Sequence, residues 1–507
     1  MDADVIIAGA GVAGLPCAAN LADCGLRVRV FESASRPGGR AASWLDHASG
    51  DIVDIGPHVL TTEHLNFLAL LRRLGTAGDV LWQPEPLITL YDSGRMLAMH
   101  SSRLPPPLHG LPNLRNTLRC VSLGAALSNL RLAWQAARLD EAGTLALDGE
   151  DALSLLQRHG VAQPFIRWFW EPAMLALLNV PLAHCSAAAM MRVFRLMLGR
   201  SGYCFGFPRR GLADLFVPGC IRRIEAAGGA LELGAGVERL IASSQGLAGF
   251  RLGDGRKVHA RTGVLALPPQ EVRLLADAGD GRLGRLAARA AAFEPCPYVS
   301  TMLWFDRKLG PHGFWARSGA QPNLNTDFYD LANIREANRG GPSLIVCNTI
   351  HARRAWNWDD ERIVELTRAE VVEALPAAAR ASVRHARVHR IPMAIACPLP
   401  GTEALRPGVR TGLPGLWLAG DWTATGLPCS MESAARSAAL VSGEVAAAAG
   451  RRAVGALARQ ETTALVAMLR RRHRLMQPPQ SQPAREPQPE PEPEPQGSPR
   501  AVRVPRP

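Results

Sequence analysis

The stretch Asp4–Ser33, DVIIAGAGVAGLPCAANLADCGLRVRVFES, decides the expected fold of this 507-residue chain. Its short apolar run Val5–Ala8 is typical of a buried parallel strand. Leu15–Cys24 predicts a helix with Gly25 as its C-terminal stop, and Arg27–Phe31 predicts a second strand. This order of strand, helix and strand predicts a Rossmann-like α/β fold with a parallel sheet.

Between the first strand and the helix, Gly9, Gly11 and Gly14 form the pattern G-x-G-x-x-G. The first glycine permits a tight turn, the second lets backbone approach a pyrophosphate, and the third lets the helix pack close to the strand. Glu32 follows Gly14 by 18 residues, where its carboxylate can accept hydrogen bonds from both ribose hydroxyls of an adenosine. The same carboxylate disfavours NADP, because a 2′-phosphate would meet like charge. A purely structural glycine-rich turn is the alternative.

Composition bounds the class of protein. The chain has 47% hydrophobic residues and a net charge of +12, and its length predicts two domains. No aromatic-plus-basic motif for nucleic acid is present, so any anionic partner is expected to be a lipid headgroup. Ten cysteines without a C-x-x-C pair indicate a reducing compartment, and we expect a cytoplasmic protein with no leader peptide and no membrane span.

Nucleotide-binding features recur along the chain, which predicts a discontinuous cofactor domain formed by residues 1–76, 203–292 and 391–450. The intervening segments, which are leucine-rich and helical or mixed, predict a substrate domain at 77–202 and 293–390. Beyond it we expect a basic helical extension at 451–475 and a disordered tail rich in proline and glutamate at 476–507.

A second cofactor-facing corner is expected near the end of the folded region. The apolar strand in GLWLAGDW ends at Gly420 and Asp421, and SMESAARS starts a helix near Met431. Asp421 could accept a hydrogen bond from a ribityl or phosphate-side hydroxyl, and the helix N-terminus would stabilise negative charge on a reduced flavin. A long dinucleotide with a redox ring needs such a corner, which indicates FAD.

Over residues 4–450 the chain resembles the flavin amine oxidase and phytoene desaturase superfamily. The matching motifs are the three glycines, Glu32, the Gly38-Gly39-Arg40 run, the Asp54-x-Gly56 pair, VLALPP, and GLWLAGDW with SMESAARS. The resemblance implies a GR2-type flavoprotein with an inserted α+β substrate domain. It also implies that Arg40 lies along the FAD pyrophosphate and that the backbone of Val237 meets the adenine.

Within that superfamily the closest resemblance is to the squalene-associated hydroxysqualene dehydroxylases, with carotenoid desaturases as the alternative. An amine oxidase is disfavoured, because Leu427–Ser430 holds no aromatic residue and the strand around Thr301 holds no lysine. A second alternative is a non-redox prenyl-binding protein of the Rab escort and GDP-dissociation-inhibitor type. Retention of Glu32, Arg40 and the second corner argues against it. The sequence does not fix the direction of hydride transfer.

The densest aromatic patch, WFWEPAM, is expected to line a polyisoprenoid site. Its candidates for substrate contact are Trp168, Phe169, Trp170 and Met174, with an ordinary helix core as the alternative. A membrane-resident substrate without a membrane span implies peripheral docking, expected at the inner face of the cell membrane through apolar helix faces and arginines.

Loss of a substrate hydroxyl requires a proton donor. The candidates are His58, in DIGPH beside the expected flavin loop, and Glu171, in WFWEP. A structural histidine and a carboxylate at a helix start are the respective alternatives.

Overall fold

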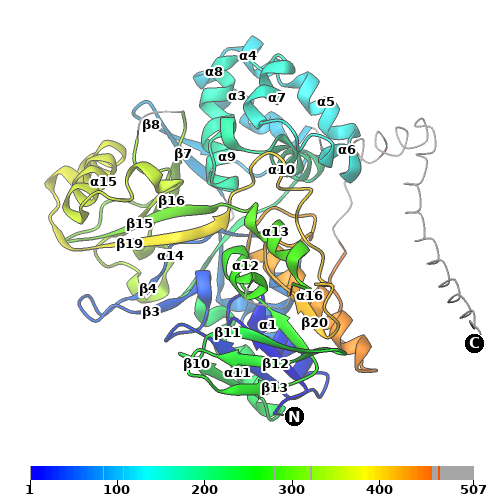
Figure 1. The fold of residues 1–507 in the computed structure, drawn as a ribbon. Helices are drawn as coiled ribbons and strands as arrows, with labels where there is room; N and C mark the ends of the chain where they lie inside the picture. Colours follow the sequence, from blue (N-terminus) through cyan, green and yellow to red (C-terminus); the bar gives the residue numbers. More distant parts are fainter. Residues whose placement is uncertain are drawn as a thin grey trace, which may run out of the picture.

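The computed structural model describes residues 2–83, 85–106, 108–277, 281–319 and 323–458, together with Val466 and Met468. It is a mixed α/β structure in which three segments far apart in the sequence, coloured blue, green and orange in Figure 1, lie together at the N-terminal end of the molecule. A second region built on a large sheet and a cluster of helices extends from them.

The cofactor-domain sheet is parallel throughout and draws its strands from all three of those segments. Its order is β10 (Ala230–Leu233), β2 (Val28–Glu32), β1 (Val5–Ala8), β14 (Gly263–Leu265) and β20 (Leu416–Leu418). The central strands are apolar and fully buried, as a parallel sheet covered on both faces requires. The Rossmann-like fold expected from the opening stretch is confirmed.

Two layers cover this sheet. One core is formed with α1 (Gly14–Ala22), α2 (Leu65–Leu74), α11 (Val217–Ala226) and α16 (Met431–Ala448). The opposite core is formed with α12 (Pro269–Asp277), α13 (Gly284–Ala291) and the antiparallel strands β11 (Val237–Ser243), β12 (Gly246–Leu252) and β13 (Lys257–His259).

The second region contains a seven-stranded sheet. Its order is β19 (Val383–Ala396), β15 (Pro295–Phe305), β18 (Leu344–Thr349), β17 (Asp327–Asp330), β16 (Phe314–Arg317), β7 (Ile88–Asp92) and β8 (Arg95–Met99). Because β19 is a single strand paired with β15 along most of its length, the domain boundary expected at residue 391 falls inside it.

The two faces of this sheet differ. One face packs on α15 (Asp360–Ala374) through an apolar core. The other face meets Val53 of β4 (Ile52–Asp54), which pairs with β3 (Ser43–Leu45), and Phe207 of β9 (Phe205–Pro208). β9 itself pairs with β5 (Leu60–Thr61) and β6 (Val80–Gln83), and α14 (Leu331–Ile334) follows β17.

A helical cap lies at the end of the molecule away from the parallel sheet (Figure 1). Its helices are α3 (Leu114–Cys120), α4 (Leu123–Leu127), α5 (Leu130–Arg138), α6 (Glu141–Leu145), α7 (Ala152–Arg158), α8 (Gln163–Phe165), α9 (Glu171–Leu178) and α10 (Ala187–Gly199). A π-helical turn, Ile166–Trp170, joins α8 to α9. Across the described part of the chain, no helix is long and apolar enough to span a bilayer.

The structure differs from the helical extension predicted at 451–475 in its first residues. Residues 451–458 form no helix, because their backbone bonds to side chains of the cofactor domain instead. The Leu457 N–H donates to Asn66 Oδ1 at 2.9 Å, and the Leu457 carbonyl accepts from Arg436. Apart from Val466 and Met468, the remainder of the extension and the whole tail at 476–507 lie outside the described residues.

Candidate active site

The glycine loop after β1 has the geometry of a phosphate cradle. A Cβ on Gly14 would lie 1.9 Å from the Gly9 carbonyl oxygen, and one on Gly9 would lie 2.5 Å from the Ala266 oxygen. Both positions therefore require glycine for packing. A Cβ on Gly11 would instead enter open space, with the Gly38 oxygen at 3.9 Å as its nearest neighbour. The open position is the one where backbone must approach a pyrophosphate.

A second pair of glycines packs against this loop. The Gly38 N–H donates to the Ala10 carbonyl at 2.9 Å, and a Cβ on Gly39 would lie 3.3 Å from the Gly11 Cα. Gly38 and Gly39 both adopt positive φ, +107° and +56°, which favours glycine. Two backbone segments without side chains thus face one another, which fits the close passage of a dinucleotide.

The adenosine end of the cradle is formed by β2 and the approach to β11. The Glu32 carboxylate accepts from the backbone N–H groups of Ala10 at 2.8 Å and Ala34 at 3.0 Å. The Ala235 N–H donates to the Glu32 carbonyl at 2.8 Å, so the segment that leads into Val237 runs beside that acid. Val237 itself is half-buried at the start of β11. The structure brings these two predicted residues to the same corner.

Arg40 and Asp421 join the front of the chain to its end. The guanidinium of Arg40 makes a bidentate pair with the buried Asp421 carboxylate, at 2.7 and 3.0 Å, and donates to the Ala394 carbonyl at 3.0 Å. The Gly420 N–H bonds to Ser437 of α16, which begins at Met431 as expected. The two predicted corners therefore meet, and the residues present fit FAD.

The loop after β4 is held by an ion pair that the sequence did not indicate. Asp54 is buried and pairs with Arg335 at 2.6 Å, while it also accepts from the Ser43 hydroxyl and the Leu212 N–H. Asp54 is thus a structural anchor. It fixes the backbone that presents Gly56 toward the seven-stranded sheet.

His58 follows that loop in a neutral state. Its Nδ1 lies 2.8 Å from the Gly56 carbonyl oxygen, which can only accept, so Nδ1 carries the hydrogen and Nε2 a lone pair. Burial lowers the pKa of His58, against the opposing effects of the Gly56 bond and Asp54. A neutral ring with a free lone pair suits an acceptor, so the geometry argues against His58 as the proton donor.

Glu171, the other acid candidate, lies at the start of α9 in the helical cap. Burial raises its pKa, and Arg167 opposes the shift. The two candidates therefore belong to different regions, one to the loop of Gly56 and one to the cap.

The predicted aromatic wall divides into two parts. Trp170 and Met174 are fully buried in the helical core, and the Trp170 indole N–H bonds to Asn129 Oδ1 at 2.8 Å. Both side chains therefore pack inside the helical core, and their predicted contact with substrate stays a prediction. Trp168 and Phe169 lie at the edge of this core, and the Trp168 carbonyl accepts from the Gly319 N–H just after β16.

A row of polar side chains crosses the seven-stranded sheet. Ser300 of β15 lies opposite Asn348 of β18 and His389 of β19, and Asn348 lies opposite Asp327 of β17. Directly opposed residues share a face, so these four side chains form one line, which we call the polar row. Single-sequence reasoning missed it, because only strand register brings the four together.

Every member of the polar row has a buried polar atom without a hydrogen-bond partner within the described structure. These atoms are His389 Nδ1, Ser300 Oγ, Asn348 Oδ1 and Asp327 Oδ1. A Cβ placed on Gly56 would lie 3.8 Å from Ser300 Oγ, so the row begins beside the expected flavin loop. Thr301, the position where the sequence suggested comparison with an amine oxidase lysine, alternates onto the α15 face.

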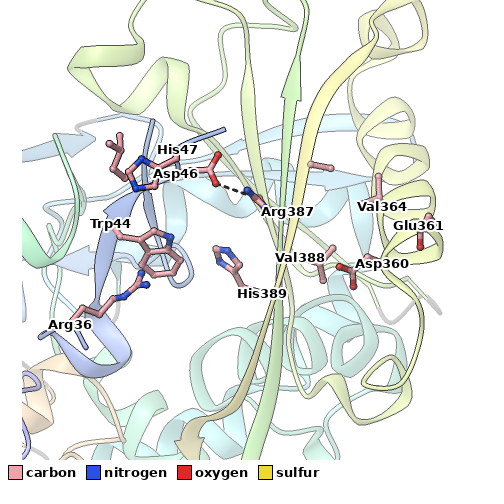
Figure 2. Close-up of a pocket in the computed structure, with 12 residues that line it drawn as sticks. Arg36, Trp44, Asp46, His47, Asp360, Glu361, Val364, Arg387, Val388 and His389 are labelled. Carbon is pink, nitrogen blue, oxygen red and sulfur yellow. Dashed lines mark hydrogen bonds and ion pairs between the residues drawn. The ribbon is translucent and has the colours of Figure 1, made fainter. Parts of the chain in front are cut away.

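The polar row continues toward an open pocket of about 820 Å³. His389, on the edge strand β19, packs against Trp44 with ring centroids 5.1 Å apart, and the Arg36 guanidinium lies 4.5 Å from the centroid of the same indole (Figure 2). Arg387 pairs with Asp46 at 3.0 Å along the same wall. The pocket lies beside β3 and β19 and is distinct from the glycine cradle.

Comparison with known proteins supports this geometry. Residues 12–446 match the family model described as flavin containing amine oxidoreductase. The chain is 24% identical over 463 residues to the 15-cis-phytoene desaturase of Solanum lycopersicum, covering 86% of this chain and 76% of that protein. It is 25% identical over 451 residues to the hydroxysqualene dehydroxylase of Sinorhizobium fredii, covering 86% of this chain and 97% of that protein.

Solved structures show the same fold. Cyclohexylamine oxidase from Brevibacterium oxydans is 19% identical with a TM-score of 0.66, covering 89% of this chain and 100% of that one. An oxidoreductase from Methanosarcina mazei is 17% identical with a TM-score of 0.64, covering 86% and 98%. Taken with the cradle of glycines and the joined Arg40–Asp421 corner, these matches show that the chain belongs to the flavin-containing amine oxidoreductase family and is an FAD-dependent oxidoreductase.

Proposed function

We propose that this protein acts on a polyisoprenoid and that its reaction is the reductive dehydroxylation of hydroxysqualene to squalene. Relatives named hydroxysqualene dehydroxylase, from Sinorhizobium fredii and Rhodopseudomonas palustris, each match over 97% of their length. Reduced FAD, when bound, supplies the hydride that such a reaction needs.

The observation that carries this proposal is the polar row in an otherwise apolar surface. Met302, Phe314, Tyr329 and Val346 belong to the same buried apolar cluster on this side of the sheet, together with Phe207 from the covering strand. A pure hydrocarbon would leave the polar atoms of the row unpartnered, which is costly in a dry environment. A long apolar chain with one hydroxyl suits the apolar cluster and gives part of the polar row a partner.

Carotenoid desaturation is the second candidate, because relatives named phytoene desaturase match with similar identity. Their named substrate class has the same apolar character but offers nothing to the polar row. Oxidation of an amine is disfavoured, since Leu427–Ser430, just before α16, contains no aromatic residue and the polar row contains no lysine. Family membership also favours redox chemistry over non-redox prenyl binding.

The proposal is tested by product analysis. Photoreduced holoenzyme should convert hydroxysqualene to squalene under anaerobic conditions, as detected by mass spectrometry. Oxidised holoenzyme with phytoene is the parallel reaction. Desaturated product from phytoene with no squalene from hydroxysqualene would replace the proposal with the second candidate.

We further propose that the outer side of the cap docks on an anionic lipid bilayer, where such substrates reside. Nine large apolar side chains in the segment 104–134 are exposed, and we call them the apolar cap surface: Leu104, Leu108, Leu111, Leu114, Leu118, Leu123, Leu127, Leu130 and Trp134. Contiguous exposed apolar surface of this kind is typical of interaction sites.

The charge of the same segment favours a membrane surface. Residues 93–139 contain six arginines and no aspartate or glutamate. Arg103, Arg115, Arg119 and Arg131 are exposed among the leucines. Apolar insertion and basic attraction to anionic headgroups would therefore act through the same segment.

A matched pair of variants tests the docking surface. Leu130 in α5 and Leu274 in α12 are each 63% exposed. Leu130→Glu should weaken partitioning onto vesicles that contain phosphatidylglycerol by about tenfold, because an apolar contact is lost and a like charge is added. Leu274→Glu, in the cofactor domain, should leave partitioning unchanged. Equal effects of the two variants, or binding that does not weaken as salt is raised, would contradict the assignment.

A further inference from the structure

The carboxyl group of Asp327 stands out in the polar row, because its two oxygens have different environments. Oδ2 accepts from the Tyr329 hydroxyl at 2.5 Å and from the Asn348 amide at 3.0 Å. Oδ1 is buried and has no partner among the described residues. Hydrogen bonds thus hold Oδ2 in place, whereas Oδ1 is buried and has no hydrogen-bond partner in the described structure.

The open oxygen belongs to the same line as the other unpartnered atoms. Asn348 Oδ1 and Ser300 Oγ lie on the next two strands of the row, in that order toward the loop of Gly56. Neighbouring strands are about 4.8 Å apart, so Asp327 and Ser300 are about 10 Å apart along the row. Asn348 lies between them, so the three side chains form a continuous buried line from Asp327 to Ser300 beside the loop of Gly56.

We propose that Asp327 is the catalytic acid that protonates the leaving hydroxyl of the substrate, with Asn348 and Ser300 holding that hydroxyl in place. This inference rests on the proposed dehydroxylation. Neither His58 nor Glu171 is needed as the donor, and the neutral His58 remains available as an acceptor.

Loss of the hydroxyl as water requires one proton and one hydride. The carbon–oxygen bond breaks and its electron pair leaves with oxygen, which takes the proton of Asp327 and departs as water. The carbon receives a hydride, with reduced FAD as the two-electron donor. The resulting Asp327 carboxylate regains its proton from solvent.

The surroundings of Asp327 keep its carboxyl protonated to a higher pH than that of an ordinary aspartate. Burial raises the pKa of Asp327 to about 6, although the hydrogen bonds from Tyr329 and Asn348 oppose the shift. On this face, His385 and Arg387 of β19 both contact Asp46, and the covering strand β4 brings Asp54, which pairs with Arg335. The other titratable groups are Tyr329 of β17, Tyr298 of β15 and His389 of β19. Burial raises the pKa of both tyrosines well above the usual range and lowers that of His389, so all three are neutral near pH 7.

The test compares Asp327→Asn with a control on the same strand. Asp330 is equally buried, but both its oxygens are hydrogen-bonded, to Ala332, Ser343 and Asn333. Under anaerobic single-turnover conditions, Asp327→Asn should slow squalene formation by about 10²–10⁴-fold, the usual contribution of a general acid. Asp330→Asn should slow it far less.

Two further readouts separate chemistry from folding. Asp327→Asn should keep bound FAD, seen in its visible absorbance. It should also keep its affinity for hydroxysqualene in the oxidised, unreactive holoenzyme, followed by perturbation of that absorbance. The wild-type single-turnover rate should fall as pH rises through about 6, whereas the rate of Asp327→Asn should not.

The outcomes are distinguishable. Squalene formation by the wild type with an equal rate in Asp327→Asn would overturn the acid assignment alone. Loss of FAD or of substrate affinity in Asp327→Asn, in proportion to the lost rate, would make Asp327 a structural residue and also overturn it. Absence of squalene with the wild type would overturn the proposed function and this inference together.

Discussion

The glycine cradle and the polar row are two halves of one proposed site, and they are encoded in opposite ways. In the cradle, Gly9, Gly11 and Gly14 lie within six residues; packing requires glycine at Gly9 and Gly14, and Gly11 leaves space for the cofactor. In the row, Ser300, Asn348 and Asp327 come from three strands and meet only through register. The cradle contains atoms that must pack, whereas the row contains buried atoms left without partners. The closely packed glycine loop identifies where the cofactor is held. The buried polar atoms without hydrogen-bond partners identify where we expect the reaction to occur.

The largest expected effect comes from substitutions in the glycine cradle. Gly14→Ala would place a Cβ 1.9 Å from the Gly9 oxygen, so β1 and α1 cannot keep their packing, and soluble folded protein should be lost. Gly11→Ala enters open space and should fold with a near-wild-type melting temperature but weakened FAD binding, measured by titration of the apoprotein. If both variants folded and bound FAD equally well, the distinction between packing and cofactor glycines would be wrong.

The next prediction concerns the polar row, where the substitution Asp327→Asn should stabilise the protein. Between pH 3.8 and about 6 the folded state keeps a proton on Asp327 that the unfolded state has lost, so wild-type stability falls as pH rises through that interval. Asp327→Asn removes this penalty and should raise the free energy of unfolding at pH 7 by about 3 kcal/mol, with the gain shrinking toward pH 4. Urea denaturation at both pH values measures it, and destabilisation at pH 7 would show that the carboxylate supports the fold.

A third, smaller effect concerns the joint between the front and end of the chain. Arg40→Ala leaves the buried Asp421 without its bidentate partner, while Arg40 itself is 35% exposed. We expect a loss of about 2–3 kcal/mol in the free energy of unfolding, together with weaker FAD binding. Arg40→Lys should restore part of the stability but less of the FAD affinity, because a lysine cannot make the bidentate contact. Unchanged FAD affinity in Arg40→Ala would remove Arg40 from the cofactor site.

The smallest effect tests Trp170, which is predicted to contact substrate but is buried in the helical core. Trp170→Phe removes the indole hydrogen bond to Asn129 and should cost about 1–2 kcal/mol of stability. The KM for hydroxysqualene should not change, since Trp170 is enclosed by the helical core. A raised KM without a loss of stability would return it to the substrate site.

The sequence was sufficient to predict the cofactor-binding part of the proposed site, because the motifs that indicate it are short and local. The spacing of Gly14 and Glu32, and the SMESAARS helix start, place atoms within one or two elements of each other, and the structure has them there. The Arg40–Asp421 pair joins residues far apart in the chain, yet both were singled out because each follows a cofactor motif.

The reactive half could not be predicted in the same way. Asp327 begins the short strand DFYD, and Asn348 and Ser300 become its neighbours only once the strand order is known. Aromatic density, which the sequence did offer, led to Trp170 and Met174, where helix packing explains the composition. The two aspartates of DFYD gave no sign in the sequence that they would be buried or which residues they would meet.

The most direct test of the account follows the hydrogen that arrives at carbon. Holoenzyme photoreduced and equilibrated in D₂O without oxygen, then mixed with unlabelled hydroxysqualene, should give squalene with one deuterium, in an amount equal to the reduced flavin consumed. Unlabelled squalene, or reduced flavin that persists unchanged in the presence of hydroxysqualene, would contradict it.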